Sequence, residues 1–356
     1  MTKIKDITVW SADLGNTKPY TIAFKTVTEV KNVFVEILLE EGITGIGAGN
    51  PSEYVVGETL EQSIEALENK NLDFLIGRDI RELNQLTFEV WRNFPENPAA
   101  RAAVDIALYD AFTKYLGVPL VKYLGQKIKK LPTSITIGIK SVEETLTEAE
   151  DYIKRGFRVI KVKLGKNLEE DVERVMKLRE KFGNQIVIRI DANQGYSIDQ
   201  TIQFYGRTYD LDLELIEQPL PAKDISGMKS LPPEVREVVA ADESLITPVD
   251  AIELIKPPKA AGIFNIKLMK CGGISQALKI ADVALHEEVD LFWGCNDESI
   301  VSITAALHAA FSCSNTKYID LDGSLDLGND IVKGGFRLKD GYMYCTDKPG
   351  LGVERV

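Results

Sequence analysis

Histidine and cysteine are scarce in this sequence of 356 residues. The two histidines, His286 and His308, both lie in segments with a helical pattern. This scarcity excludes a histidine-rich metal site and argues against a Ser-His-Asp triad. The four cysteines, at positions 271, 295, 313 and 345, show no C-x-x-C spacing, which favours free thiols in a reducing compartment.

Long apolar runs and an excess of basic residues are also missing. No apolar run approaches the roughly 18 residues of a membrane-spanning helix, and the N-terminus turns polar too soon for a signal peptide. The 54 acidic residues outnumber the 42 basic ones and give a formal net charge of −12, without a basic stripe. We therefore expect a cytoplasmic protein that binds neither nucleic acid nor membrane. The sequence is compatible with a homo-oligomer but gives no argument for an oligomeric state.

The first part of the chain does not repeat a strand–helix unit, and we expect an α+β capping domain over residues 1–125. Two antiparallel strands and three helices are expected over Ile4–Ser11, Val33–Leu39, Glu58–Glu68, Ile80–Trp91 and Asn97–Leu116. The glycine-rich run Gly45–Gly49 resembles part of a dinucleotide-binding loop, but Pro51 follows and no strand–loop–helix unit opens there. We therefore interpret these glycines as loop backbone.

From about residue 131 onward, apolar strands alternate with amphipathic helices. Strands are expected over Thr133–Ile139, Phe157–Lys163, Ile186–Asp191, Leu213–Glu217, Val238–Asp242, Ile263–Lys267, Val289–Gly294 and Tyr318–Asp322. The ends of the second to seventh strands are 25 to 28 residues apart, which indicates a (β/α)8-type (TIM-like) barrel in the α/β class. A doubly wound open sheet is the alternative, but it usually has fewer strands. We assign the barrel to residues 126–322 and expect residues 323–356 to return to the capping domain.

Charged residues end five consecutive expected strands. In chain order these residues are Lys161 and Lys163, then Asp191, Glu217 and Asp242, then Lys267. Capping of the following helix would explain one such carboxylate, but not three in succession between lysines. Barrel strands present their C-terminal ends at a common mouth, and three carboxylates converging there repel one another unless a cation lies between them. Oxygen ligands without histidine or cysteine suit Mg²⁺.

The lysines on both sides of the three carboxylates indicate proton transfer. An ammonium group close to a divalent cation and to other ammonium groups has a lowered pKa, which makes it a usable general base near neutral pH. Such a site can remove a proton α to a metal-bound carboxylate. The metal stabilises the enediolate, one lysine takes the proton, and the other can return it from the opposite face.

The motifs around these residues resemble the enolase superfamily, in particular its muconate-lactonizing-enzyme subgroup, over essentially the whole chain. They are Lys161-Val-Lys163, Arg189-Ile-Asp191-Ala-Asn193-Gln-Gly195, Glu217-Gln-Pro219, Ala241-Asp242-Glu243-Ser244 and Asn265-Ile-Lys267-Leu-Met-Lys-Cys-Gly-Gly273. The resemblance implies that the Mg²⁺ ligands are Asp191, Glu217 and Asp242. It also implies that Lys163 and Lys267 form the acid/base pair and that Lys161 supports Lys163. Strand seven has no histidine, which excludes the mandelate-racemase pattern.

The end of the eighth expected strand suggests the substrate. Period two places Asp320 and Asp322 on one face, where they can bind a cationic ammonium group. At a barrel mouth this pair resembles the feature with which dipeptide epimerases hold the N-terminal amine of a dipeptide. The resemblance implies 1,1-proton transfer at the C-terminal residue of a dipeptide, similar to L-Ala-D/L-Glu epimerases. We also count Thr136, on the first barrel strand, and Lys161, on the second, as substrate-binding.

Other activities share part of this pattern. o-Succinylbenzoate synthase and N-succinyl amino acid racemase have the same lysines and carboxylates, but their substrates carry no free amine for the aspartate pair. Muconate cycloisomerase has the same difficulty. A non-catalytic barrel that binds peptides or metal is the alternative from a different class, but binding alone requires neither lysine.

Three residues bear on side-chain specificity. Lys25 favours an acidic substrate side chain, whereas Glu53 and Asp297 favour a cationic one. Two carboxylates against one ammonium favour dipeptides with a Lys or Arg side chain over Ala-Glu. We further expect Glu243 to face away from the site and Lys270 to belong to a loop that shapes the pocket.

Overall fold

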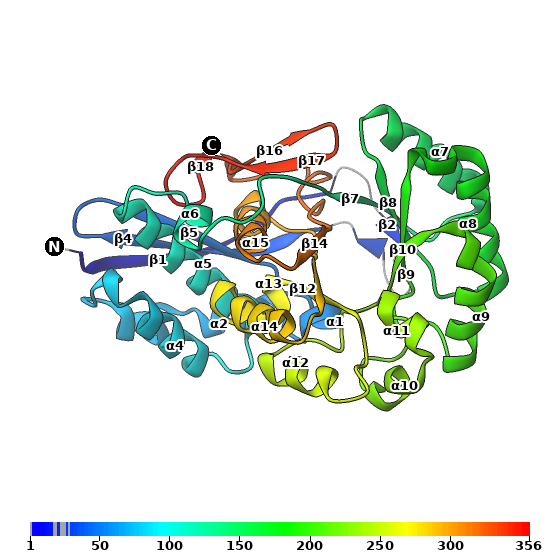
Figure 1. The fold of residues 1–356 in the computed structure, drawn as a ribbon. Coiled ribbons are helices and arrows are strands. Elements are labelled where there is room, and N and C mark those ends of the chain that lie inside the picture. Colours follow the sequence, from blue (N-terminus) through cyan, green and yellow to red (C-terminus); the bar gives the residue numbers. More distant parts are fainter. Residues whose placement is uncertain (1, 17–19, 22–25, 28) are drawn as a thin grey trace.

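The computed structural model describes residues 2–16, 20–21, 26–27 and 29–356 (Figure 1). Strands β1 (Ile4–Asp13), β4 (Lys31–Leu39) and β5 (Thr44–Gly49) form an antiparallel sheet in that order. Both strands expected in this region are therefore confirmed. The helices of this part are α1 (Glu53–Val56), α2 (Leu60–Ala66), α3 (Asn69–Leu72), α4 (Leu83–Asn93), α5 (Pro98–Tyr115) and α6 (Leu120–Tyr123). Two short strands, β2 (Tyr20–Thr21) and β3 (Thr26–Val27), pair with each other.

The interpretation of Gly45–Gly49 as loop backbone is wrong, because these residues form most of β5. The alanine-rich helix α5 lies directly on this strand. A Cβ atom at Gly47 would lie 1.8 Å from the carbonyl oxygen of Ala103, and one at Gly45 would lie 2.3 Å from the backbone nitrogen of Ala111. The glycines therefore permit a close contact between helix and strand.

Eight parallel strands form the predicted barrel. In sheet order they are β14 (Thr316–Ile319), β13 (Asp290–Trp293), β12 (Ile263–Ile266), β11 (Val239–Ala241), β10 (Leu213–Glu217), β9 (Val187–Asp191), β8 (Val159–Lys163) and β7 (Ser134–Ile137). An isolated parallel bridge between Thr133 and Ile319 joins the first strand to the last. Five predicted strands extend too far, since β7, β11, β12, β13 and β14 end before the expected Ile139, Asp242, Lys267, Gly294 and Asp322.

Helices cover the outside of the barrel. They are α7 (Val142–Lys154), α8 (Leu168–Phe182), α9 (Ile198–Thr208), α10 (Ile225–Ser230), α11 (Pro233–Val238), α12 (Pro248–Ile255), α13 (Leu268–Cys271), α14 (Ile274–His286) and α15 (Ile300–Ser312). One buried apolar cluster includes residues of β4, α5, α14 and α15, so the sheet domain and this side of the barrel share a core. A second cluster lies between β8, β9, α8 and α9, on the opposite side of the molecule in Figure 1.

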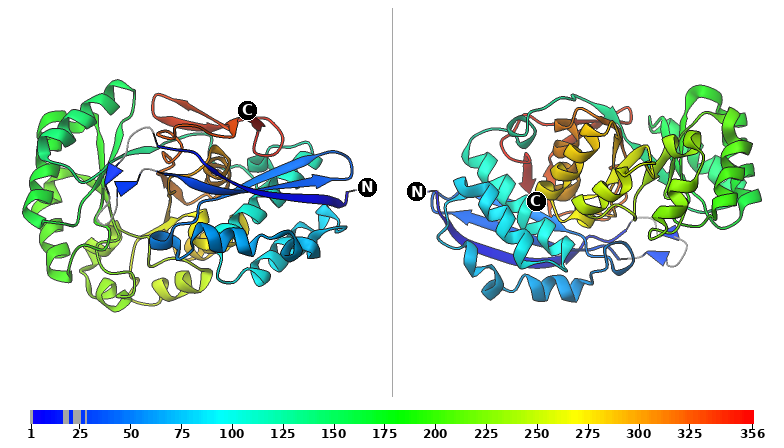
Figure 2. Two further views of the ribbon diagram at one scale, coloured as in Figure 1. Left: turned by 180° about the vertical axis from the view of Figure 1, so that it is seen from behind. Right: turned by 60° about the horizontal axis from the view of Figure 1, so that its bottom comes forward.

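The end of the chain runs back beside the N-terminal sheet, as both views of Figure 2 show. It contains β15 (Val332–Gly334), β16 (Phe336–Lys339), β17 (Tyr342–Cys345) and β18 (Val353–Arg355). Leu351 N–H donates to Asp110 of α5 at 2.8 Å, and Arg355 Nη1 lies 3.3 Å from Glu36 of β4. The boundaries at residues 125 and 322 stay predictions.

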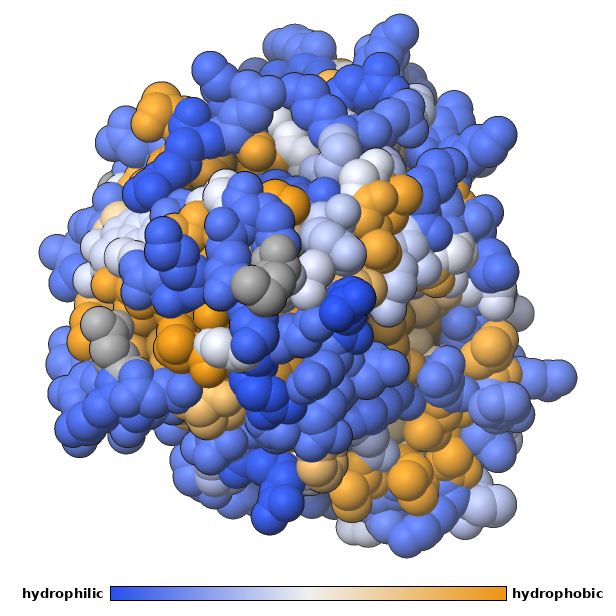
Figure 3. All heavy atoms as spheres, turned by 90° about the vertical axis from the view of Figure 1, so that its left-hand side faces the viewer, coloured by the Kyte–Doolittle hydropathy of each residue, from blue (hydrophilic) through white to orange (hydrophobic). Residues whose placement is uncertain are grey.

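Among the described residues, the face shown in Figure 3 has no single large hydrophobic patch. Hydrophilic side chains cover most of this face, and the hydrophobic ones lie in separate groups. Of the helices in the described part of the chain, none combines the length and the apolar character that crossing a bilayer requires. All four cysteines are free thiols.

Candidate active site

The charged residues predicted at the strand ends lie at one mouth of the barrel. Lys163 at the end of β8 is in register with Asp191 at the end of β9, and Asp191 is in register with Glu217 at the end of β10. Asp242 directly follows β11, and Lys267 directly follows β12. The sheet therefore places three carboxylates on adjacent strands, with a lysine on each side.

The two outer carboxylates each contact one of the predicted acid/base lysines. Lys163 Nζ lies 2.6 Å from Asp191 Oδ2, and Lys267 Nζ lies 2.7 Å from Asp242 Oδ2. Both aspartates are buried, whereas 19% of the Lys163 side chain and 8% of the Lys267 side chain are exposed. Each lysine can therefore reach the cavity while a carboxylate holds its ammonium group.

Glu217 shows the electrostatic character of a cation site. Burial, followed by repulsion from Asp191, raises the pKa of Glu217 to about 8. Lys161 Nζ lies 3.3 Å from Glu217 Oε2. Within the described residues, no three acidic, histidine or cysteine side chains form a ready-made metal cluster, and lysine ammonium groups contact the carboxylates instead. The buried oxygen donors nevertheless fit Mg²⁺ chemically, because a divalent cation would relieve the repulsion between them.

Neighbouring carboxylates dominate the pKa values of two lysines of the site. Burial alone would lower the pKa of Lys161, but attraction by Asp320 and Glu217 outweighs burial and raises it well above its usual value. Burial likewise opposes the charge of Lys267, and Asp242 raises its pKa above the usual value. The predicted lowering applies to a lysine beside a bound cation and stays a prediction, because carboxylates alone lie closest to both ammonium groups. A lowered pKa would require a bound cation that offsets these carboxylates.

The aspartate pair lies just beyond β14 and not within it. Lys161 donates a hydrogen bond to Asp320 Oδ2, and the backbone N–H of Thr136 donates to Asp322 Oδ2 at 2.8 Å. Burial, followed by repulsion from Asp320, raises the pKa of Asp322 to about 7. Thr136 thus positions one carboxylate of the pair, and a cation bound there would favour the charged form of both.

A cavity of about 670 Å³ is lined by Thr136, Lys161, Lys163, Asp242, Lys267, Asp320 and Asp322, whereas Asp191 and Glu217 are fully buried and are not part of its lining. Glu53, at the start of α1, and Asp297, in the loop after β13, also line it. Lys25 lies outside the described residues. Among the described lining residues there are eleven carboxyl groups and five lysines. The acidic groups are Glu29, Glu53, Glu58, Glu61, Glu148, Glu243, Asp242, Asp297, Asp320, Asp322 and Asp326. This balance favours a cationic ligand.

The prediction that Glu243 faces away from the site is wrong. Glu243 lines the cavity, and its Oε2 atom is buried without a hydrogen-bond partner among the described residues. Burial, followed by repulsion from Asp242, raises the pKa of Glu243 to about 7. The physical reason is that β11 ends at Ala241, so the alternation of a strand does not apply at Asp242 and Glu243.

The site contains one residue that is not among the predicted site residues, Asn265, and one that contacts a predicted ligand directly, Lys270. Asn265 Nδ2 donates to Glu217 Oε1 at 2.8 Å, and Lys270 Nζ lies 2.5 Å from Asp242 Oδ1. The alternation Asn265-Ile-Lys267 indicates the first, because it places both side chains on one face of the strand expected over Ile263–Lys267. Lys270 lies in the short helix α13, and the alternation of the barrel strands does not predict where this helix places its side chains.

The fold and the site together define a class of protein. A barrel mouth with buried carboxylates between two lysines can hold a carboxylate substrate and move a proton on either of its faces. This is the arrangement of acid/base enzymes with the enolase-type barrel.

The comparisons with known proteins agree with this class. Residues 144–355 match the model "Enolase C-terminal domain-like", and residues 6–125 match "Mandelate racemase / muconate lactonizing enzyme, N-terminal domain". The chain is 53% identical to an L-Lys-D/L-Arg epimerase of Desulforapulum autotrophicum over 99% of this chain and 100% of that protein. It is 36% identical to an L-Ala-D/L-Glu epimerase of Clostridium acetobutylicum over 99% of both chains.

A solved structure of a dipeptide epimerase from Methylococcus capsulatus, complexed with Mg and the dipeptide L-Arg-D-Lys, has a TM-score of 0.97. Its sequence is 49% identical, and the match covers 99% of both chains. The chain belongs to the mandelate racemase/muconate lactonizing enzyme family of the enolase superfamily. The predicted family and barrel are therefore confirmed.

Proposed function

We propose that the chain is a dipeptide epimerase that inverts the α-carbon of the C-terminal residue by 1,1-proton transfer. The observation that carries this proposal is the placement of Lys163 and Lys267 on opposite sides of the three carboxylate-bearing strands. Two bases on opposite faces can remove a proton from one face and return it to the other, which a binding protein does not require. The epimerases named above support a dipeptide as the substrate.

Mg²⁺ is the proposed cofactor, and Asp191, Glu217 and Asp242 would hold it. The bound ion would draw charge from the substrate carboxylate and so make the neighbouring α-proton more acidic. Lys163 and Lys267 then hold and move that proton, each on its own face. Lys161 adds positive charge beside Lys163.

The free amine of the dipeptide would bind at the aspartate pair. Asp320 and Asp322 line the cavity, and Thr136 fixes Asp322 through its backbone N–H. A substrate with an acylated amine lacks the charge that would bind there. The pair therefore argues against an N-succinyl amino acid as the substrate.

We extend the proposal to dipeptides with Lys or Arg side chains. Glu53 and Asp297 belong to the acidic majority of the cavity lining, which complements cationic side chains. The names of the relatives from Desulforapulum autotrophicum and Methylococcus capsulatus point in the same direction. A cytoplasmic location and a homo-oligomeric state stay predictions.

Solvent-deuterium exchange tests the proposal. The chain is incubated with Mg²⁺ in D₂O, and L-Lys-L-Arg, L-Ala-L-Glu and N-succinyl-L-Arg are followed by NMR. We expect exchange at the C-terminal α-carbon and kcat/KM at least tenfold higher for L-Lys-L-Arg than for L-Ala-L-Glu. If N-succinyl-L-Arg exchanges faster than L-Lys-L-Arg, the substrate is an N-succinyl amino acid and not a dipeptide. A tenfold preference for L-Ala-L-Glu would refute the proposed specificity for cationic side chains. If none of the three compounds exchanges, the proposed epimerase activity is refuted.

A further inference from the structure

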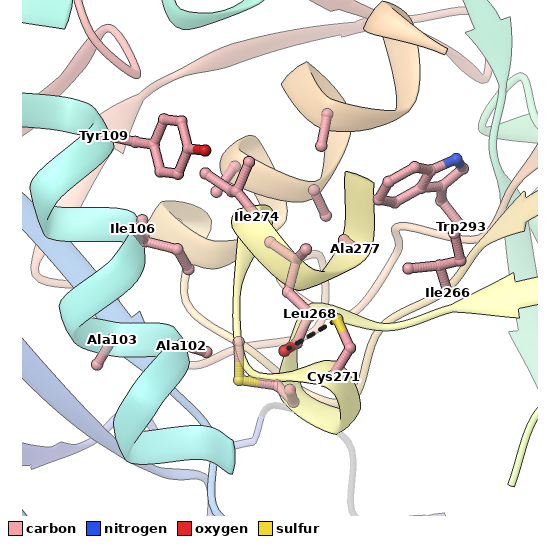
Figure 4. Packing of buried hydrophobic residues seen from close by; sticks show 14 of the residues in the cluster. Ala102, Ala103, Ile106, Tyr109, Ile266, Leu268, Cys271, Ile274, Ala277 and Trp293 are labelled. Atoms are coloured by element: carbon pink, nitrogen blue, oxygen red, sulfur yellow. Dashed lines mark hydrogen bonds between the residues drawn. The ribbon is translucent and has the colours of Figure 1, made fainter. Parts of the chain in front are cut away.

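Helix α5 packs against the segment that follows the sixth barrel strand. Ile106 of α5 lies beside Leu268, Cys271 and Ile274 in one apolar cluster (Figure 4). Leu268 and Cys271 are the first and last residues of α13, which begins directly after Lys267. A helix of the N-terminal region is therefore in contact with the backbone that carries an acid/base lysine.

Arg101 reaches this segment from α5. Its Nη2 atom donates a hydrogen bond of 3.1 Å to the carbonyl oxygen of Cys271, and the residue is 6% exposed. The next residue, Gly272, has a φ of +85°, and a Cβ atom there would lie 2.0 Å from Arg101 Nε. The end of α13 thus lies directly against the guanidinium group, and the positive φ of Gly272 favours glycine there.

Asp105, one turn further along α5, holds the start of α14. The N-cap of α14 is Gly273, which has no side chain to accept a hydrogen bond. Asp105 Oδ1 takes this role and accepts the backbone N–H groups of Ile274 at 2.6 Å and Ser275 at 3.3 Å. The cap of α14 is therefore supplied by another helix, far away in the sequence.

The held segment carries two lysines of the site. Lys267 and Lys270 both contact Asp242, at 2.7 Å and 2.5 Å. Lys270 Nζ also donates to the carbonyl oxygen of Asn265 at 3.1 Å. Since α13 has four residues, little more than one helical turn separates Lys267 from the contacts with α5. A shift at that end therefore reaches the Lys267 backbone directly.

We infer that Arg101 and Asp105 are positioning residues, which fix the backbone of Lys267 and thereby the reach of its ammonium group to the substrate α-carbon. The inference rests on the proposed epimerase function. Lys163 depends on other contacts, because it is the last residue of β8 and is in register with Asp191 of β9, whereas Lys267 lies beyond the end of β12. Loss of the α5 contacts should therefore slow proton transfer on one face of the substrate more than on the other.

The test measures exchange of the two epimers separately in D₂O, with L-Lys-L-Arg and L-Lys-D-Arg. Lys267→Ala first identifies the epimer whose α-proton leaves through Lys267. Asp105→Ala should slow exchange of that epimer at least tenfold more than exchange of the other. Asp105→Asn keeps one acceptor oxygen for the two N–H groups and should bring the ratio back towards the wild-type value. Arg101→Met, which keeps a long apolar stem, should change the ratio in the same direction as Asp105→Ala.

Asp110→Asn is the matched control. Asp110 lies on the same helix, is buried, and accepts the N–H groups of Ile46 at 2.9 Å and Leu351 at 2.8 Å. It should lower the melting temperature without changing the ratio of the two exchange rates. The inference would be overturned if Asp105→Ala and Arg101→Met slow the exchange of both epimers by the same factor. It would also be overturned if Asp110→Asn changes the ratio of the two exchange rates as much as Asp105→Ala does. If Asp105→Ala does not fold, the exchange ratio of Arg101→Met alone tests the inference. If the wild type exchanges neither epimer, the proposed function is overturned and not this inference.

Discussion

Lys161 donates a hydrogen bond to Asp320, which joins the second barrel strand to the residue that follows the eighth. Both side chains are buried, and the same ammonium group lies 3.3 Å from Glu217. The aspartate proposed to bind the substrate amine therefore also neutralises a lysine beside the proposed base. Amine binding and the charge around Lys163 are thus coupled through a single carboxylate.

Removing this carboxylate charge should impair use of a free dipeptide. Asp320→Asn leaves the Lys161 ammonium and the substrate amine with less negative charge, and loss of a buried charge partner costs about 2–4 kcal/mol. We expect kcat/KM for L-Lys-L-Arg to fall roughly 30- to 800-fold, and Asp322→Asn to act in the same direction. The N-acetylated dipeptide should be a poor substrate of the wild type. Turnover of the acetylated dipeptide at the rate of the free one would contradict the proposed amine site.

The two lysines should have separable roles. Lys163→Ala and Lys267→Ala should each abolish epimerisation, because each variant lacks the base on one face. Each variant should still exchange the α-proton of one epimer, and the two variants should retain opposite epimers. NMR of both epimers in D₂O measures this, and wild-type turnover in either variant would eliminate the two-base mechanism.

Metal removal should abolish exchange and lower thermal stability. EDTA should inactivate the enzyme, and added Mg²⁺ should restore exchange and raise the melting temperature, because a ligand that binds only the folded state stabilises it. Glu217→Gln removes one oxygen charge from a carboxylate whose pKa is already raised to about 8 by burial and Asp191. The variant should therefore fold but show no Mg²⁺-dependent rise in melting temperature at the concentration that saturates the wild type. An equal rise in both proteins would show that Glu217 does not bind the ion.

Side-chain specificity should depend on the acidic lining of the cavity. Asp297→Leu and Glu53→Gln each remove one charge, so kcat/KM for L-Lys-L-Arg should fall about tenfold, as for loss of a partly buried charge contact. The value for L-Ala-L-Glu should stay constant or rise. Glu65→Gln changes the net charge equally at an exposed position outside the cavity and is the control. If Asp297→Leu changes kcat/KM for both substrates by the same factor, this residue does not determine side-chain specificity.

The sequence predicted the parts of the site that follow from the strand pattern. Lys163, Asp191 and Glu217 end their strands as expected, because alternation and the regular repeat place strand ends at one mouth. Glu243 and the strand β5 were misjudged for a different reason. The first depends on where β11 stops, and the second depends on the approach of α5, which lies about 55 residues further along the chain. Such contacts are not encoded in a local pattern.

His308 carries a pH dependence of stability that is independent of the active site. It is buried in α15, its Nδ1 atom accepts the N–H of Val121 at 3.1 Å, and its Nε2 atom has no hydrogen-bond partner in the described chain. Burial lowers the pKa of His308 to about 3. In the unfolded chain His308 therefore takes up a proton as the pH falls through about 6.5, whereas in the folded protein it stays neutral down to about pH 3. The contribution of His308 to folding stability therefore decreases on acidification across this window.

His308→Asn should remove most of this pH dependence, because the asparagine oxygen can accept the Val121 N–H but does not titrate in this range. Between pH 7 and pH 4.5, the wild type should lose roughly 2–3 kcal/mol more unfolding free energy than the variant. Urea unfolding at both pH values measures the difference. His286→Asn, at an exposed position near the end of α14, is the matched control and should keep the wild-type pH dependence. If His308→Asn loses as much stability as the wild type over this range, His308 is charged in the folded protein and its neutral burial is refuted.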